Sequence, residues 1–111
     1  MKDDLVFIEH ILDSINAIEE FSKDLTREEL ESNRLKQSAI VREIEIIGEA
    51  VKNLSSPFRD KHKNIEWKNI TGTRDKMIYH HFGVDLNIIW DIIKKHLPKL
   101  KREVERIKKE E

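Results

Sequence analysis

The chain of 111 residues has the length of one small domain and carries 21 basic and 22 acidic side chains, for a formal net charge of −1. It contains no cysteine, which excludes a disulfide framework, a thiolate metal site and a cysteine nucleophile. With 38% hydrophobic and 39% charged residues but only 3 glycines and 2 prolines, the composition favours long charged helices over sheets. We expect a single domain over residues 1–111, without a membrane span, in the cytoplasm.

The near-zero net charge conceals a gradient along the chain. Residues 1–36 carry 5 basic and 10 acidic groups and sum to −5, whereas residues 57–81 carry 6 and 3 and sum to +3. The second of these stretches also holds three of the five histidines. This balance argues against a protein that binds nucleic acid over its whole surface, but it is compatible with a confined phosphate site.

The first half of the chain shows two helical regions. The first begins at residues 3–4, where aspartates are good N-caps, and places apolar residues at steps of three and four as far as Phe21. The second begins at Thr26, and its apolar steps become regular over residues 40–54. Whether this region breaks near residues 32–33 stays open from the pattern alone.

The second half predicts a short helix and a long one, after an irregular or single-turn connection over residues 58–66. The short helix covers residues 66–79, and Asp85 is the N-cap of a last helix over residues 86–107. Pro98 must kink or restart that last helix, because it lacks an N–H and its ring clashes with the preceding turn. Together the segments predict an all-α fold, an antiparallel bundle of four to five helices.

The predicted helices carry more isoleucine-rich surface than the core of one bundle needs, so we expect a homodimer. The residues left over are Val41, Ile46, Ala50, Ile88, Ile89 and Ile92.

The short helix holds the residues of chemical interest. Its steps of three and four run through Trp67, Ile70, Arg74, Met77 and His81, so a cation and an imidazole occupy positions where the spacing predicts core. One interpretation is structural: Arg74 pairs with a buried carboxylate and His81 ends the helix. The other is an anion site, because a guanidinium fits phosphate and an imidazole exchanges protons near neutral pH, which together suffice for metal-free phosphodiester cleavage. The carboxylates available for the structural pairing are Glu43, Glu45 and Glu49.

Helix geometry limits which histidine serves. At about 100° per residue, only His81 shares the face of Arg74 within one intact helix, and it lies two turns away. His80 meets an arginine only if the helix unwinds before Gly83, or if that arginine belongs to a second protomer. A composite site between two protomers is therefore a physical expectation.

Other constellations are weak. No two histidines have the HExxH spacing and the glycines are isolated, so we expect no metal and no cofactor. His10, His62 and His96 stand in charged surroundings and are expected to be solvated. Trp67 and Trp90 stand at helical apolar spacing and are expected in the core.

Three stretches of the sequence resemble the HepT-like branch of the HEPN superfamily, and the resemblance spans nearly the whole chain. They are Arg42-Glu-Ile-Glu-Ile-Ile-Gly-Glu-Ala-Val-Lys52, residues 67–70, and Arg74-Asp-Lys-Met-Ile-Tyr-His-His-Phe-Gly-Val-Asp85, with Trp90 after them. The resemblance implies a HEPN-like helical bundle, a homodimer whose arginine-histidine motifs face a shared cleft, and metal-independent endoribonuclease activity. It also implies a toxin role, opposed by a minimal nucleotidyltransferase antitoxin that adenylylates a tyrosine of the motif.

The family motif is arginine, four residues, histidine, one residue, tyrosine. Arg74 matches its first position, but the histidine position falls on Tyr79 and the tyrosine position on His81. We therefore assign the acid/base role to His80 with Arg74 and keep His81 as the alternate. Tyr79 is the only tyrosine in the chain and the candidate for adenylylation. Asp75 is a candidate for orienting the arginine or a histidine, although an exposed helix carboxylate is its more ordinary interpretation.

Two functions from different classes follow. The first is a ribonuclease toxin that cuts RNA by attack of the 2′-hydroxyl at a dimeric site. The second is a catalytically weak binding module, which serves as partner and substrate of a nucleotidyltransferase or binds nucleotide without cleavage. The expected partners are RNA, the nucleotidyltransferase antitoxin and a second copy of the chain.

Overall fold

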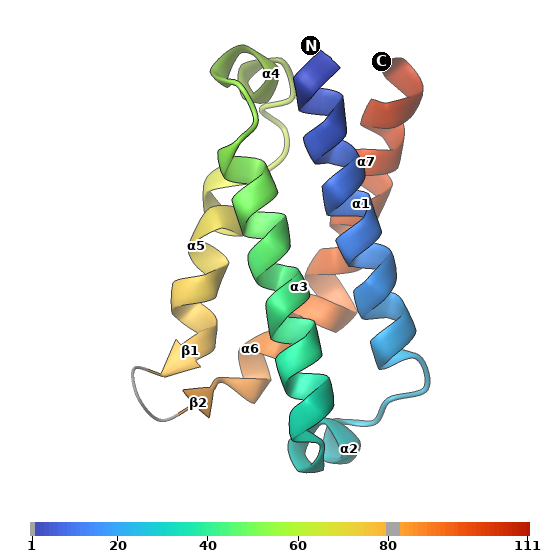
Figure 1. The fold of residues 1–111 in the computed structure, drawn as a ribbon, viewed down its shortest axis with the longest axis vertical. Helices are drawn as coiled ribbons and strands as arrows, with labels where there is room; N and C mark the ends of the chain where they lie inside the picture. The colour runs from blue at the N-terminus through green and yellow to red at the C-terminus, as the bar shows by residue number, and fades with distance from the viewer. Residues whose placement is uncertain (1, 80–82) are drawn as a thin grey trace.

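Two long helices, α1 (Lys2–Ser22) and α3 (Arg34–Lys52), run side by side at the centre of the fold (Figure 1). The computed structural model describes residues 2–79 and 83–111 of the chain. A third helix, α5 (Trp67–Met77), packs on α3. Because each of these helices shows the apolar spacing of the sequence, the predicted all-α bundle is confirmed.

The last third of the described chain is a continuous helical run with an irregular middle. It begins as α6 (Leu86–Asp91), passes through a π-helical turn, η1 (Ile92–His96), and continues as α7 (Leu97–Glu110). α7 packs on α1 and runs back toward the N-terminus of the chain (Figure 1).

Pro98 accounts for the irregular turn. It stands in the first turn of α7, has no N–H to donate, and its ring crowds the carbonyls before it. The N–H of Leu97 accordingly bonds to the carbonyl of Ile92, five residues back, which is the bond that defines a π-turn. The predicted restart of the last helix at the proline is confirmed.

The second helical region breaks at Asn33. Before it lies α2 (Arg27–Ser32), which begins with a capping box: Glu29 N–H donates to the Thr26 hydroxyl (3.1 Å) and Thr26 N–H donates to the Glu29 carboxylate (3.1 Å). The Asn33 side chain then accepts from the N–H of Lys36 (3.0 Å) and caps α3. The second helical region therefore does break near residues 32–33, because Asn33 ends α2 and caps the start of α3.

A single-turn helix, α4 (Ser56–Lys61), is fastened to the start of α1. The Ser55 hydroxyl caps it by accepting from Phe58 N–H (3.3 Å). The carboxylate of Asp4, only 4% exposed, accepts from both Ser55 N–H (2.7 Å) and the Ser55 hydroxyl (2.8 Å). A buried charge is thereby satisfied, and two distant segments are joined.

A short strand pair follows α5 and corrects one sequence boundary. β1 (Ile78–Tyr79) pairs antiparallel with β2 (Gly83–Val84), and the N–H of Asp85 bonds to the carbonyl of Met77 (2.5 Å). The prediction of helix as far as Tyr79 was wrong by two residues. Isoleucine and tyrosine favour extended backbone, and the pairing across this hairpin supplies the hydrogen bonds that a longer helix would have made. Asp85 caps α6, as predicted.

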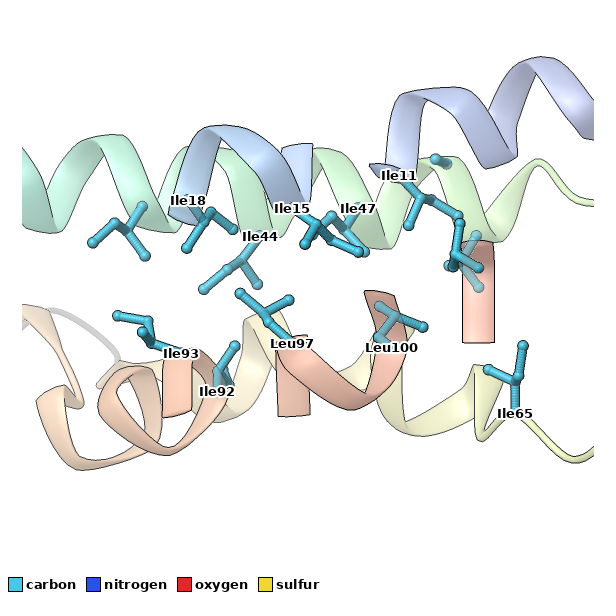
Figure 2. Close-up of a cluster of buried hydrophobic side chains, with 14 of the residues drawn as sticks. Ile11, Ile15, Ile18, Ile44, Ile47, Ile65, Ile92, Ile93, Leu97 and Leu100 are labelled. Atoms are coloured by element: carbon cyan, nitrogen blue, oxygen red, sulfur yellow. The ribbon is translucent and has the colours of Figure 1, made fainter. Parts of the chain in front are cut away.

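The core is formed mainly by isoleucine and leucine stripes that face one another across the bundle. Figure 2 shows those of α1 and α3 on one side and those of η1 and α7 on the other; the labelled members include Ile11, Ile15, Ile44, Ile47, Ile92, Ile93, Leu97 and Leu100. All are less than 9% exposed.

Three of the six residues left over by the sequence for a dimer belong to this core instead. Ala50 of α3, Ile89 of α6 and Ile92 of η1 are buried within one chain. The remaining three, Val41, Ile46 and Ile88, are half-buried.

We expect Asp4→Ala to lower the free energy of unfolding by about 2–4 kcal/mol, because it removes a buried charged acceptor that holds two Ser55 donors. Urea denaturation followed by circular dichroism measures the change. The matched control is Asp3→Ala, an exposed aspartate in the same helical turn, which should cost no more than about 1 kcal/mol. Equal losses from the two variants would show that the Asp4–Ser55 contact does not stabilise the fold.

Candidate functional site

Trp67 anchors the start of α5. Its side chain is buried, and its indole Nε1–H donates to the carbonyls of His62 (3.2 Å) and Arg59 (3.3 Å). The prediction of a core tryptophan is confirmed here. Because the indole is tied to the backbone of the preceding segment, the position of the helix start is fixed.

The face of α5 toward the core carries the arginine position. Ile70 is half-buried against the core and Met77 is fully buried. Position 74 follows the same steps of three and four from Trp67, so the backbone of α5 sets Arg74 on this face. Asp75 is the next residue of the helix, about 100° further round.

The candidate histidines come after the end of α5. His80 and His81 lie outside the residues that the structure describes. The helix ends at Met77, so the intact-helix geometry that favoured His81 does not hold. The condition set for His80, an end to the helix before Gly83, is met by the described backbone. Tyr79 lies on β1 and not on the helix.

α3 contacts α5 in the first half of the helix, near Ile70. A Cβ at Gly48 would lie 3.8 Å from the carbonyl oxygen of Ile70, an ordinary van der Waals contact between the two helices. Of the three α3 carboxylates considered as partners of the arginine, Glu43 and Glu45 are half-buried and Glu49 is exposed. The structural interpretation, in which Arg74 pairs with one of these carboxylates, stays a prediction.

His62 is buried, which corrects the prediction that it is solvated. The residue is 6% exposed, and its ring packs on Phe58, with 4.7 Å between ring centroids. Its Nε2 lies 3.3 Å from a carboxylate oxygen of Glu111, and the same oxygen accepts from Lys61 Nζ (2.8 Å). The local pattern held no sign of this contact, because Glu111 comes 49 residues later. His62 therefore ties α4 to the end of α7 and is a structural residue.

Glu111→Gln is expected to lower the melting temperature near pH 7 but not near pH 3. The hydrogen bond from Lys61 lowers the pKa of the Glu111 carboxyl, with a smaller contribution from His62. The stabilisation by the charged form is thus present above the unfolded pKa and is lost as the pH falls through the folded pKa. Thermal denaturation of wild type and variant at both pH values measures it.

The control for this prediction is Glu110→Gln, a neighbouring exposed glutamate of α7. It should leave the pH dependence of the melting temperature close to that of wild type. A Glu111→Gln deficit that persists near pH 3 would assign the effect to packing and not to charge.

Of the other residues considered in the sequence, two histidines lie at the surface as predicted, and the second tryptophan lies at the edge of the core. His10 and His96 are exposed. Trp90 is half-buried and packs against the core, with Lys94 Nζ 4.8 Å from its ring centroid. These contacts give Trp90 a packing role.

A groove of about 310 Å³ lies between α5 and the η1–α7 run, and the sequence pattern did not reveal it. Its floor is apolar and includes Ile44 and Ile47 of α3 and Leu97 and Leu100 of α7, which appear together in Figure 2. Polar and charged side chains form its rim: Glu66, Lys76, Asp91, His96, Lys99 and Glu103. The groove arises from the spacing of two helices in space, and one of its walls is the helix that carries Arg74.

Within residues 2–79 and 83–111, histidine, aspartate and glutamate side chains form no group of three or more that could hold a metal ion. In the same part, every helix is too short or too polar to cross a bilayer.

One protein family, described as Ribonuclease HepT-like, has a model that matches residues 11–107. A Methanocaldococcus jannaschii protein named "Gamma-glutamylcyclotransferase and putative RNase" is 46% identical over 109 residues, which cover 98% of this chain and 49% of that protein. The chain therefore spans about half the length of this relative.

Two further relatives match along nearly their whole length. A Caldanaerobacter subterraneus subsp. tengcongensis protein named "Putative RNase" is 42% identical over 111 residues, covering 100% of this chain and 99% of that one. A Thermococcus cleftensis protein named "Probable ribonuclease HepT" is 37% identical over 103 residues, covering 93% and 94%. Among solved structures, none matches the chain.

Proposed function

Because the chain belongs to the HepT-like ribonuclease family, we propose that it is a metal-independent endoribonuclease in which Arg74 and His80 are the working pair, with His81 as the alternate acid/base. The proposed site is composite: two protomers pair so that their motifs face a shared cleft. One domain over residues 1–111 supplies each half of it.

The backbone at the end of α5 is the observation that carries this proposal. The helix ends at Met77, three residues after Arg74, and the pairing of Tyr79 with Gly83 turns the chain back. The N–H of Asp85 then bonds to the carbonyl of Met77 (2.5 Å). The chain on both sides of the two histidines is therefore held at the end of the arginine helix, which supports a shared role for these residues.

In the proposed reaction the imidazole of His80 takes the proton of a ribose 2′-hydroxyl. The 2′-oxygen attacks the adjacent phosphorus and displaces the 5′-oxygen of the next nucleotide, which takes up a proton. The guanidinium of Arg74 offsets the negative charge that builds on the non-bridging oxygens. The products are a 2′,3′-cyclic phosphate and a 5′-hydroxyl.

We expect Arg74→Ala and His80→Ala each to slow cleavage of a labelled single-stranded RNA by about 10²–10⁴-fold, the range for loss of a charge-stabilising or proton-transfer group. His81→Ala is the matched variant, with a smaller loss expected if His80 is the acid/base. Gel-resolved time courses at equal protein concentration give the rates.

Two outcomes would contradict this function. If wild type leaves RNA intact at high concentration, the nuclease fails and the weak binding module takes its place. If Arg74→Ala cleaves at the wild-type rate, the activity does not come from this site.

We also propose a toxin role in the cytoplasm, opposed by a cognate minimal nucleotidyltransferase antitoxin. Tyr79 is the only tyrosine of the chain, lies on β1 and comes directly before His80, so its adenylylation would add a bulky anionic group next to the proposed acid/base. Blocked RNA binding is the physical reason that such a modification would silence the enzyme.

Incubation with the nucleotidyltransferase and ATP should add the mass of one adenylyl group to the wild type and none to Tyr79→Phe. Intact-mass spectrometry measures this, and peptide mapping identifies the modified residue. Modification that persists in Tyr79→Phe would remove Tyr79 from this role.

A further inference from the structure

The last helix, α7, has two opposite faces of different chemistry. One face is aliphatic and buried in the core, and it is formed by Leu97, Leu100, Val104 and Ile107. The opposite face carries four exposed cations at steps of three and four: Lys99, Arg102, Arg106 and Lys109. At about 100° per residue these four positions fall within roughly 80° of arc, so they form one column along the helix. This column is the cationic stripe of α7.

The glutamates of α7 lie outside the cationic stripe. Along the sequence they alternate with the cations, which makes this segment look like an ordinary mixed surface. Around the helix, however, Glu105 falls on one side of the stripe, and Glu103 and Glu110 fall on the other. The fold therefore sorts an interleaved sequence into a column of one charge.

The two remaining lysines of α7 are engaged with α1. Lys101 Nζ lies 2.7 Å from a carboxylate oxygen of Glu19, and Lys108 pairs with Glu9. For the cationic stripe, by contrast, no carboxylate among residues 2–79 and 83–111 comes within ion-pair distance. Like charges three and four residues apart repel one another and destabilise a helix. An external anion on the stripe would offset this repulsion.

The chemistry of α7 fits a soluble polyanion better than a lipid surface. A helix that lies on a membrane inserts apolar side chains beside its basic ones. The aliphatic residues of α7 are buried in the core, and every exposed residue of this helix is charged. From Lys99 to Lys109 the stripe rises about 15 Å, with successive cations about 5 Å apart along the axis. An extended nucleic-acid backbone can set consecutive phosphates along such a column.

The cationic stripe begins beside the helix of the proposed site. Lys99 lines the groove whose other wall is α5. Thr73 and Lys76, which stand on either side of Arg74 in the sequence of α5, line the same groove. From there α7 runs along the bundle toward the N-terminus of the chain (Figure 1). A strand that leaves the proposed site across the groove can therefore follow α7.

We propose that the cationic stripe of α7 is an RNA-backbone site, which holds phosphates of a single-stranded substrate away from the bond that is cut. The proposal rests on the proposed function, because a ribonuclease substrate is the polyanion that the stripe would meet. Its lysines and arginines contact phosphates and not base edges, so the site contributes affinity without sequence preference.

Fluorescence anisotropy with a labelled single-stranded RNA tests the stripe. The RNA is fully 2′-O-methylated, so its 2′-oxygens are blocked and binding is measured without cleavage. Arg102→Gln/Arg106→Gln should raise the Kd about tenfold at low salt, because two phosphate contacts are lost. Each such contact contributes about −0.7 to the slope of log association constant against log salt concentration, so the slope of this variant should be shallower by about 1.4.

Two further variants serve as controls. Lys101→Gln/Lys108→Gln removes the same number of charges from the same helix, but from the side that pairs with α1, and should keep the wild-type Kd and slope. Arg102→Lys/Arg106→Lys keeps both charges of the stripe and should bind RNA close to wild type. Circular dichroism and a melting curve establish that each variant is folded.

Three results would overturn the stripe as an RNA site: a wild type that does not bind the methylated RNA, an Arg102→Gln/Arg106→Gln variant with the wild-type salt slope, or an equal loss in the Lys101→Gln/Lys108→Gln control. Vesicles of phosphatidylserine and phosphatidylcholine provide the membrane comparison. If the variant loses vesicle binding but keeps RNA binding, the stripe is a lipid site instead.

Cleavage of unmodified RNA by the same samples separates this proposal from the proposed function. A protein that binds RNA through the stripe but leaves it intact contradicts the nuclease alone. A protein that cleaves RNA, with binding indifferent to Arg102 and Arg106, contradicts the stripe alone.

Discussion

The packing of α3 between α1 and α5 is the constraint on which the rest of the structure depends. The inward residues of α3, among them Ile40, Ile44 and Val51, are buried. α3 as a whole packs on both α1 and α5. Gly48 lies where α5 comes near, and a Cβ there would stand 3.8 Å from the carbonyl oxygen of Ile70. Since α3 is the main support of α5, this contact also determines where Arg74 stands.

α5 depends on long-range contacts for its position more than on its own helix propensity. Thr71, Gly72 and Thr73 are three weak helix formers in a row, directly before the arginine, and the two threonine hydroxyls bond back to backbone carbonyls at 3.0 and 2.7 Å. The helix is held from outside this weak stretch, by the Trp67 indole at its start and by the strand pair at its end. Such an arrangement couples the geometry around Arg74 to contacts that lie up to about two helical turns away.

Local chemistry made much of the fold predictable, and distant contacts explain what was missed. The spacing of isoleucines found the long helices, Asp85 was recognisable as a cap, and the ring of Pro98 required an irregular turn. The end of α5 was predicted too late because it depends on a hairpin that closes from Met77 to Asp85. The burial of His62 depends on a contact with the far end of the chain, which no window of sequence contains.

In the candidate site, too, some features follow from the local sequence and others depend on distant contacts. The sequence singled out Arg74 from its place on an apolar stripe, and the structure shows that this position lies on the helix α5, but the roles of Arg74, His80 and His81 stay predictions. The groove beside α5 could not have been foreseen, because it exists only once two helices that are distant in sequence have taken their places around α3.

In the proposed reaction, protein side chains alone drive attack by the 2′-hydroxyl of RNA. The most direct measurement is the cleavage, in the presence of EDTA, of an RNA oligonucleotide and of the same oligonucleotide with a single 2′-deoxy nucleotide at the cut site, with the products identified by mass. We expect the RNA to be cut to a 2′,3′-cyclic phosphate and a 5′-hydroxyl, and the deoxy-substituted strand to stay intact at that position. Cleavage of the deoxy position, or loss of all cleavage with EDTA, would contradict it.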